Sequence, residues 1–426
     1  MEQFVIEGNT PLSGAITPAG NKNAALPLLA ASLLTDQPLV LRNVPRIRDV
    51  QIMCQLLSDL GVDISEIDQH TLRLQASRIS KTDLNAELCK DIRASILLAG
   101  PTLARLGQVE LPPPGGDVIG RRRLDTHFLA FKRLGAEMEC NDRFRVHAHH
   151  LVGADILLDE ASVTATENAV MAAALARGTT IFRNAASEPH VQDLCHCLVE
   201  MGAHIEGIGS NMLTIHGVER LGGAEFEIGA DYLEVGSYIV LAAVTGGEVL
   251  IKAAAPEHLG MTQLVFDRLG IRWEMRGRDV LVSRGQSLTI VPDLGDAIPK
   301  IDDAPWPGFP ADLMSIAIVA ATQAAGSVLF HEKMFESRLY FVDKLIGMGA
   351  RIVLCDPHRC IVQGPAWLRG ERLESPDIRA GMALVIAALA ARGQSIIRNI
   401  GQIDRGYERV DEKIRALGGK IERVQV

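Results

Sequence analysis

The feature that most constrains the fold of this chain is a six-fold internal repeat. Along 426 residues, a Leu-Gly or Met-Gly pair closes a helix-like stretch six times, at spacings of 67 to 79 residues. The glycines of these pairs are Gly61, Gly135, Gly202, Gly270, Gly349 and Gly418. Glycine directly after a helix is favoured because it adopts the left-handed conformation without steric cost. A fixed period of this kind predicts six copies of one supersecondary unit.

Each copy is predicted to read strand, helix, strand, helix, strand, strand. In the third copy, residues 169–178 form the first helix with Gly178 at its end, and 179–185 form a strand. Residues 190–202 then form a second helix and 203–217 a hairpin. Helices that alternate with strands indicate an α/β class, and the hairpin in each unit indicates mixed sheets.

Six such units are too many for one core, so we expect two domains of three units each. The predicted division gives residues 1–21 plus 230–426 to one domain and 22–229 to the other. The opening strand, residues 4–8, precedes the first unit and needs a sheet to join. A cleft between the two halves, lined by helix N-termini, is the expected ligand site.

Polar or charged groups stand ahead of each apolar helix. They are Lys22-Asn23, Asp91 with Arg93, Glu167-Asn168, Asp231, Asp312, and Asp377 with Arg379. Helix N-termini with such groups are suited to anions. The net charge of −9 argues against a general nucleic-acid binder. Together these features favour an enzyme for phosphorylated substrates, with its cations concentrated locally.

The cysteines and the N-terminus exclude other classes. Seven cysteines, an odd number, do not indicate a disulfide framework. Cys195, His196 and Cys197 lie in a predicted helix, where neighbours point in different directions, so we expect buried thiols and no metal site. The first residues carry no signal-peptide pattern, and no apolar run approaches the ~18 residues of a membrane span. We therefore expect a soluble, cytosolic protein with no membrane partner.

Eight segments carry a resemblance to a known family. They are residues 20–34 (GNKNAALPLLAASLL), 91–95 (DIRAS), 114–127 (PGGDVIGRRRLDTH), 161–168 (ASVTATEN), 309–313 (FPADL), 335–338 (FESR), 377–381 (DIRAG) and 403–410 (IDRGYERV). In this order the segments resemble the enolpyruvyl transferase family over essentially the whole chain. The resemblance implies a two-domain inside-out α/β barrel, with three βαβαββ units and mixed sheets in each domain.

The resemblance also implies a reaction and its substrates. The 3-hydroxyl of UDP-N-acetylglucosamine attacks C2 of phosphoenolpyruvate, and the tetrahedral intermediate then loses phosphate; this is the first committed step of peptidoglycan synthesis. No metal, organic cofactor, nucleic acid or obligate protein partner is implied. Two alternatives stay open: a different acceptor, such as another nucleotide or a shikimate-type compound, and a non-catalytic paralogue that only binds ligands.

The resemblance assigns the anion-binding residues. Lys22 and Asn23 match the family's phosphoenolpyruvate-binding pair. Without the resemblance, the two residues would be interpreted as a solvated lysine beside an ordinary Asn N-cap. Arginine forks fit carboxylate and phosphate groups bidentately. The matching arginines are Arg122, Arg338, Arg379 and Arg405 for the anions and Arg93 for the nucleotide sugar.

Asp312 precedes an apolar helix and could simply cap it, a contribution of about 1 kcal/mol. The resemblance instead implies a carboxylate that orients the sugar 3-hydroxyl and acts as general base. Lys22 and Arg405 join Asp312 among the residues expected to take part in catalysis.

The loop 111–123 is rich in proline and glycine, which predicts an irregular exposed segment. In the family this loop is a lid, and the position of Asp117 is usually a cysteine that protonates C3 and is alkylated by fosfomycin. Aspartate is a known variant there and can serve as the general acid. Arg121, Arg122 and Arg123 should lower its pKa, whereas dehydration and a nearby phosphate should raise it.

Two further segments and one methionine match the family's nucleotide-sugar positions. The first segment holds Arg122, Arg123, Leu124, Asp125, Thr126 and His127, and the second holds Glu160, Ala161, Ser162 and Val163. Thr164 replaces a common glycine, and Glu160 a common lysine or proline. Met334 matches a position beside the sugar. Without the resemblance, it would be interpreted as a buried core methionine.

Overall fold

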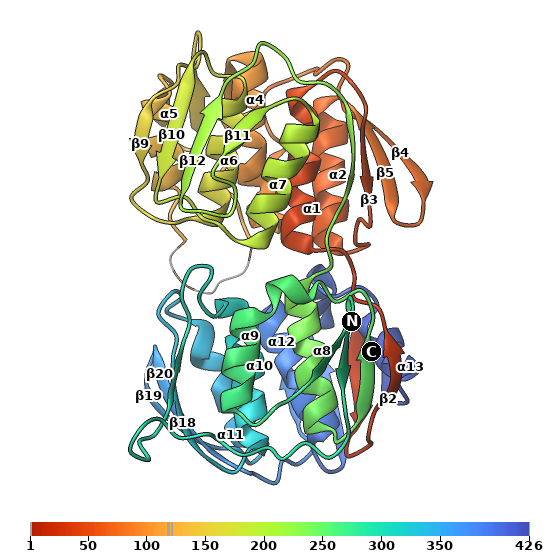
Figure 1. Cartoon of the computed structure of the whole chain (residues 1–426). Coiled ribbons are helices and arrows are strands. Elements are labelled where there is room, and N and C mark those ends of the chain that lie inside the picture. Colours follow the sequence, from red (N-terminus) through yellow and green to blue (C-terminus); the bar gives the residue numbers. More distant parts are fainter. Residues whose placement is uncertain (1, 117–119, 121, 426) are drawn as a thin grey trace. The chain divides into compact units, whose positions relative to one another are not determined.

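The computed structural model describes residues 2–116, 120 and 122–425. The chain forms two compact units. The C-terminal unit comprises residues 2–19, 120 and 230–425, and the N-terminal unit comprises residues 20–116 and 122–229. Both can be followed by colour along the sequence in Figure 1.

The elements of the C-terminal unit follow the predicted order of strands and helices. They are β1 (Glu2–Glu7), β2 (Ser13–Ile16), α8 (Tyr232–Val244), β14 (Glu248–Ile251), η3 (Pro256–His258), α9 (Gly260–Arg268), β15 (Glu274–Arg276), β16 (Asp279–Val282), β17 (Lys300–Asp302), α10 (Ala311–Gln323), β18 (Gly326–His331), η4 (Arg338–Phe341), α11 (Val342–Gly347), β19 (Arg351–Asp356), β20 (Arg359–Gly364), β21 (Arg372–Glu374), α12 (Ile378–Ala390), β22 (Gln394–Arg398), η5 (Ile400–Arg405), α13 (Val410–Ala416) and β23 (Lys420–Gln425).

Three four-stranded sheets surround the core of this unit, in the orders β15-β16-β14-β2, β17-β18-β20-β19 and β21-β22-β1-β23. Each sheet contains one parallel pair, and its other pairs are antiparallel. Helices α8, α10 and α12 are buried along almost their entire length, because their residues are mostly alanine, leucine, isoleucine and valine. A helix that is apolar all round belongs in an interior.

The N-terminal unit has the same plan. Its elements are α1 (Lys22–Ala31), η1 (Ser32–Leu34), β3 (Leu39–Arg42), α2 (Arg48–Leu60), β4 (Asp63–Asp68), β5 (Thr71–Gln75), α3 (Ala86–Asp91), η2 (Arg93–Leu98), α4 (Ala99–Leu106), β6 (Gln108–Leu111), α5 (Asp125–Arg133), β7 (Glu137–Cys140), β8 (Phe144–His147), β9 (Asp155–Leu157), α6 (Val163–Ala174), β10 (Thr179–Arg183), α7 (Pro189–Glu200), β11 (His204–Glu206), β12 (Met212–His216) and β13 (Ala224–Glu227).

The sheets of this unit are β13-β3-β5-β4, β11-β12-β10-β9 and the three-stranded β6-β8-β7. The last is antiparallel, and a single parallel bridge between Asp83 and Glu110 stands where the other sheets have a parallel edge strand. Helices α1 and α6 are buried on nearly all sides. The predicted mixed α/β class is confirmed, and none of the sheets built from described residues closes into a barrel.

The Leu-Gly and Met-Gly prediction is confirmed at all six positions. The glycines come one or two residues after the ends of α2, α5, α7, α9, α11 and α13, and each has φ between 77° and 105°. In this region an L side chain is strained, so the repeated glycine is a requirement of the helix end.

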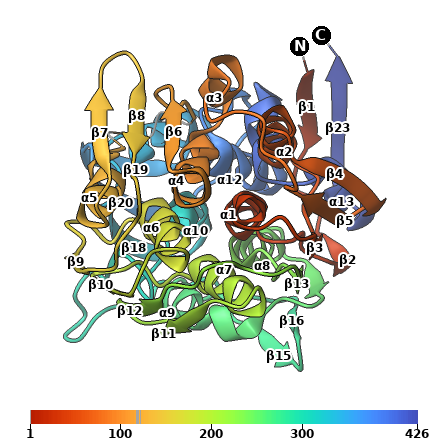
Figure 2. The same cartoon turned by 90° about the horizontal axis from the view of Figure 1, so that it is seen from above.

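The opening strand joins the sheet of the last repeat. Strand β1 lies between β22 and β23 and is antiparallel to both, so the two ends of the chain share one sheet. Figure 2 shows β1 and β23 side by side.

Three predicted helix boundaries were wrong. Helix α6 begins at Val163, so Glu167 and Asn168 lie within the helix and do not precede it. Asp91 ends α3, and extended Ile92 separates it from η2. Helix α6 ends at Ala174, four residues before Gly178, which has φ 87° in the turn that follows. Composition alone does not distinguish a helix from the apolar turn that continues it.

Candidate active site

Asp312 is at the centre of a buried ionic cluster in the C-terminal unit. Its carboxylate accepts a hydrogen bond from Nη2 of Arg338 at 2.6 Å and another from Nε of Arg379 at 3.0 Å. The two arginine side chains are only 4% and 5% exposed, whereas that of Asp312 is 29% exposed. The N-cap of α10 is Pro310, so the capping role considered for Asp312 is not what its carboxylate does.

The charges of the cluster set the protonation of Asp312. Burial opposes the charged carboxylate, but the guanidiniums of Arg379 and Arg338 outweigh that effect and hold its pKa well below the usual range. Asp312 is therefore ionised in this arrangement. A carboxylate held in this way orients its neighbours well but accepts a proton poorly.

Two donors of this cluster are unused. The buried Nε of Arg338 and Nη1 of Arg379 have no hydrogen-bond partner among the described residues. Such orphans are rare in folded proteins and need an explanation, for which an absent ligand is one candidate. Since both groups are cationic, the ligand that would satisfy them is an anion.

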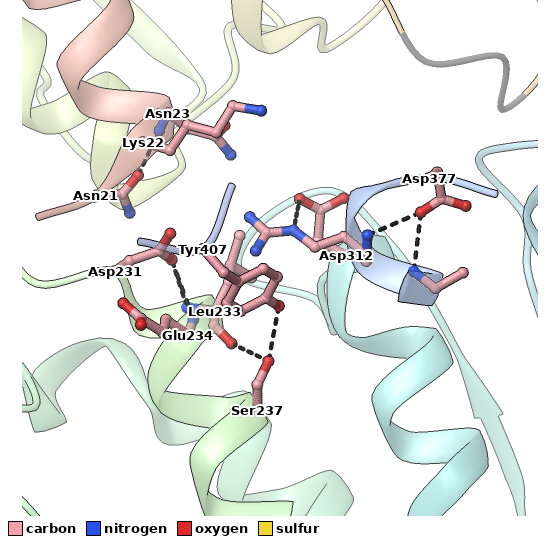
Figure 3. A network of polar contacts seen from close by, with 12 residues as sticks. Asn21, Lys22, Asn23, Asp231, Leu233, Glu234, Ser237, Asp312, Asp377 and Tyr407 are labelled. Atoms are coloured by element: carbon pink, nitrogen blue, oxygen red, sulfur yellow. Dashed lines mark hydrogen bonds and ion pairs between the residues drawn. The ribbon is translucent and has the colours of Figure 1, made fainter. Parts of the chain in front are cut away.

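Arg379 is held from several sides. The N-cap residue Asp377 accepts hydrogen bonds from the backbone N–H groups of Arg379 and Ala380 at 2.8 and 2.9 Å. The guanidinium carbon lies 5.2 Å from the ring centre of Tyr407, a cation–π distance. The hydroxyl of Tyr407 in turn bonds with Ser237 of α8 at 3.0 Å, as Figure 3 shows together with Asp312 and Asp377.

Arg405 ends η5, which packs closely on α12. A Cβ atom on Gly381 would lie 2.7 Å from Cγ1 of Ile403, so only glycine permits this approach. Arg405 is 7% exposed and donates to Gln402 at 3.0 Å. The preceding residue, Asp404, accepts two hydrogen bonds from Arg423 of β23 at 2.8 and 2.9 Å. Strand β23 therefore fixes the segment that carries Arg405.

The segment that leads to Arg338 is held by two buried carboxyl groups. Asp303 accepts from the backbone N–H groups of Lys333 at 2.5 Å and Met334 at 3.2 Å, and Glu332 accepts from Phe335 at 3.2 Å. Burial, and then the neighbouring Asp303, raise the pKa of Glu332 to about 9. Met334 itself is 40% exposed, so the reading of a buried core methionine was wrong.

In the N-terminal unit, Lys22 is the first residue of α1 and is buried, not solvated. Its ammonium pairs with Asp49 at 2.8 Å, and both residues are less than 9% exposed. The cap of the helix is Asn21, whose side-chain oxygen accepts from the N–H groups of Asn23 and Ala24 at 2.8 and 3.1 Å. Asn23 is therefore not the N-cap. Figure 3 shows Asn21, Lys22 and Asn23.

Arg93 and the segment 122–127 meet in the N-terminal unit. Nη2 of Arg93 donates to the backbone carbonyl of Arg122. Burial, and then the charge of Arg122, lower the pKa of Arg93 to about 10. Leu124 packs partly against the core, and Arg123 pairs with Asp125 at 3.1 Å.

The two segments predicted to bind the nucleotide lie together in this unit. Asp159 accepts from Arg123 at 3.0 Å and from the buried hydroxyl of Thr126 at 2.7 Å. His127, also buried, bonds with Thr164 at 3.2 Å. Next to Asp159, Glu160 is exposed, Ala161 and Ser162 are half-buried, and Val163 begins α6.

The remaining predictions concern the lid residues, the cysteines, metal sites and membrane-spanning helices. Asp117 and Arg121 lie outside the described residues. Cys195 and Cys197 are free and buried, as predicted, and His196 is exposed. Within the described residues no group of three or more His, Cys, Asp or Glu side chains could hold a metal ion. A search of those residues also finds no helix long and apolar enough to cross a membrane.

Known proteins similar to this chain share its whole length. A family model described as EPSP synthase (3-phosphoshikimate 1-carboxyvinyltransferase) matches residues 6–414. The chain belongs to the EPSP synthase family of enolpyruvyl transferases. It is therefore an enzyme, a transferase, and the predicted resemblance is confirmed.

Relatives within this enolpyruvyl transferase family are close. A protein of Treponema denticola is 56% identical over 422 residues, which cover 99% of both chains. One of Bradyrhizobium diazoefficiens is 57% identical, with 99% of this chain and 98% of the relative covered. Both relatives are named UDP-N-acetylglucosamine 1-carboxyvinyltransferase.

Solved structures of enolpyruvyl transferases share the fold. The enzyme NikO from Streptomyces tendae has a TM-score of 0.88 at 24% identity, with 100% of this chain and 99% of that chain covered. EPSP synthase from Acinetobacter baumannii has a TM-score of 0.76 at 17% identity, with both chains covered completely. At these identities the likeness concerns the fold alone.

Sequence reasoning missed several residues that hold this transferase's candidate site in place. They are Asn21, Asp49, Asp159, Asp303, Glu332, Tyr407 and Arg423. Only Asn21 had a local signal, because an Asn directly before a helix predicts an N-cap. The others act through contacts distant in sequence.

Proposed function

We propose that the chain transfers the enolpyruvyl group of phosphoenolpyruvate to the 3-hydroxyl of UDP-N-acetylglucosamine. In the addition, the 3-oxygen forms a bond to C2 while C3 gains a proton and the hydroxyl loses one. In the elimination, C3 loses a proton and the bond between C2 and the phosphate oxygen breaks. Inorganic phosphate leaves and the enol ether remains.

The acceptor is proposed from the names of the relatives. Identities of 56% and 57% over nearly the full length support the same acceptor for this chain. A cytoplasmic location and the place in peptidoglycan synthesis belong to the same proposal and rest on the same similarity. The alternative of a shikimate-type acceptor has only the name of the family model in its favour.

The observation that carries the residue assignments is the pair of unused donors on Arg338 and Arg379. Phosphoenolpyruvate brings a carboxylate and a phosphate, and arginine forks fit both groups. An anion that binds these two arginines weakens their hold on Asp312. The carboxylate is then able to turn to the 3-hydroxyl, and its pKa rises toward the value a base needs.

The other cations complete this assignment. We assign Arg405, Lys22 and Arg122 to the charges of phosphoenolpyruvate and its departing phosphate. Arg93, which donates to the backbone of Arg122, is assigned to shaping the nucleotide-sugar side. Asp117 is assigned as the acid that protonates C3.

Release of inorganic phosphate tests the proposal. Phosphoenolpyruvate is supplied with UDP-N-acetylglucosamine, with shikimate 3-phosphate, with a second UDP-sugar, and with no acceptor. We expect rapid phosphate release with UDP-N-acetylglucosamine only. Preference for shikimate 3-phosphate would favour the alternative acceptor. No release with any acceptor would favour a paralogue that only binds.

A further inference from the structure

Two buried hydroxyl groups of the C-terminal unit form a hydrogen-bond chain whose direction follows from its partners. Oγ of Ser237 lies 2.9 Å from the backbone carbonyl of Leu233, which can only accept, so the single proton of Ser237 is directed there. The same Oγ lies 3.0 Å from the hydroxyl of Tyr407. Because Ser237 has no second proton to give, Tyr407 is the donor of this bond. Both residues are buried, so the bond fixes the tyrosine ring and the rotation of its hydroxyl.

The ring of Tyr407 supports the guanidinium of Arg379. The guanidinium carbon lies 5.2 Å from the ring centre, and Nε is bound by Asp312 at 3.0 Å. Burial raises the pKa of Tyr407 above its usual value, and the charge of Arg379 offsets this only in part, so the phenol keeps its proton. Since that proton points to Ser237, the cation meets the electron-rich face of a neutral ring.

These contacts restrict where the spare donor of Arg379 can point. The residue is 4% exposed, and its Nη1 has no hydrogen-bond partner among the described residues. A guanidinium is planar and rigid, so the bond at Nε and the contact with the ring together set the direction of Nη1. The backbone of Arg379 is held by Asp377. A donor fixed in this way binds an anion without first losing the freedom of a long side chain.

We propose that Tyr407 is a positioning residue that directs Nη1 of Arg379 toward the anionic substrate, and that Ser237 holds Tyr407 in the orientation this requires. The inference rests on the proposed function, since it takes phosphoenolpyruvate as the anion. The two hydroxyl residues act through Arg379 and set the affinity for phosphoenolpyruvate, while Arg338 continues to hold Asp312.

Steady-state kinetics of variants at these two positions test the role. Tyr407→Leu removes the ring and should raise the KM for phosphoenolpyruvate about 30-fold. Tyr407→Phe keeps the ring but loses the bond to Ser237, and should raise this KM about five-fold. Ser237→Ala removes the same bond and should have the same effect, so combining it with Tyr407→Phe should add nothing. In each variant we expect kcat within about two-fold of the wild type and an unchanged KM for UDP-N-acetylglucosamine.

Tyr238→Phe is the matched control. Tyr238 is also buried and follows Ser237 in α8, but its hydroxyl donates to Glu234. This variant should lose stability and keep the wild-type KM for phosphoenolpyruvate. Circular dichroism would confirm the fold of every variant, and Tyr407→Phe decides the matter if Tyr407→Leu does not fold.

Two kinetic results would overturn the inference and leave the proposed function intact. One is a wild-type KM for phosphoenolpyruvate in both Tyr407→Phe and Ser237→Ala. The other is an equal rise of this KM in Tyr238→Phe, which would indicate a general loss of packing. A wild type that releases no phosphate from phosphoenolpyruvate with UDP-N-acetylglucosamine would overturn both the inference and the proposed function.

Discussion

At the scale of single residues, the chemistry proposed for the C-terminal unit depends most on Asp312. Its carboxylate is bound by two buried arginines, and an ordinary helix-capping aspartate would leave those arginines unpaired. The apolar helix that begins one residue before it was predictable from the sequence, although Asp312 was expected to precede that helix. The family resemblance assigned its two partners, 26 and 67 residues away along the chain, to substrate anions, and their pairing with Asp312 was not predicted.

Replacing Asp312 by asparagine should therefore affect catalysis more than folding. We expect kcat of Asp312→Asn to fall by about 10²- to 10⁴-fold, because the base and the orientation of the hydroxyl are both lost. Steady-state kinetics would measure the change, with circular dichroism to confirm the fold. Asp343→Asn, on the exposed side of α11, is the matched control and should keep wild-type kcat. A variant with near wild-type kcat would remove Asp312 from the mechanism.

The aspartate at position 117 makes a prediction about inhibition. A carboxylate is a poor target for an epoxide that alkylates thiols, so fosfomycin should not inactivate the wild-type enzyme over time. Asp117→Cys should become sensitive, and Asp117→Ala should lose turnover. Peptide mass analysis should place the adduct at position 117, because Cys140 and Cys355 are also exposed. Time-dependent inactivation of the wild type would contradict the assignment.

At the scale of elements, the repeat explains what the sequence could predict. A left-handed glycine after each second helix is a local requirement, so all six helix ends were found. The start of α6 was misplaced because Glu167 and Asn168 are buried polar residues inside a helix, and polar residues more often lie at helix ends. Asn168 is tolerated there because its amide hydrogen bonds are satisfied by Gly100, Ile96 and His127.

The segment before η4 should make stability depend on pH. The raised pKa of Glu332, about 9, means that the folded chain keeps a proton that the unfolded chain loses above about pH 4.5. The contribution of Glu332 to the unfolding free energy is complete below about pH 4.5 and is lost as the pH rises toward 9. Compared with Glu332→Gln, the wild type should lose up to about 1.4 kcal/mol of unfolding free energy per pH unit. Urea unfolding of both proteins at pH 6, 7 and 8 would measure this difference. Unfolding free energies that change equally with pH in the two proteins would refute a protonated Glu332.

At the scale of the whole molecule, the two ends of the chain meet in one sheet, and Arg423 connects that sheet to the site. Besides Asp404, its guanidinium reaches Glu2 of β1 at 3.0 Å and Asp411 of α13 at 3.2 Å. The sequence predicted six units and an unpaired first strand. It could not predict which sheet that strand joins, because this pairing spans more than 380 residues.

Replacing Arg423 by methionine should therefore reduce both stability and substrate binding. We expect a loss of about 2 kcal/mol in unfolding free energy, because three carboxylates lose the arginine that they share. We also expect a higher KM for phosphoenolpyruvate, because Asp404 no longer fixes the segment of Arg405. Arg276→Met, which breaks only an exposed pair with Glu274, should cost less than about 1 kcal/mol and leave KM unchanged. Equal effects of the two substitutions would contradict this role.

The central claim is that this transferase attaches an enolpyruvyl group to the 3-oxygen of a UDP-sugar. The most direct measurement uses phosphoenolpyruvate labelled with ¹³C at C2 and follows its reaction with UDP-N-acetylglucosamine by NMR. The account predicts a new coupling between the labelled carbon and the proton on C3 of the sugar, formed in step with inorganic phosphate. A label that stays in phosphoenolpyruvate, or couples to another sugar proton, would contradict it.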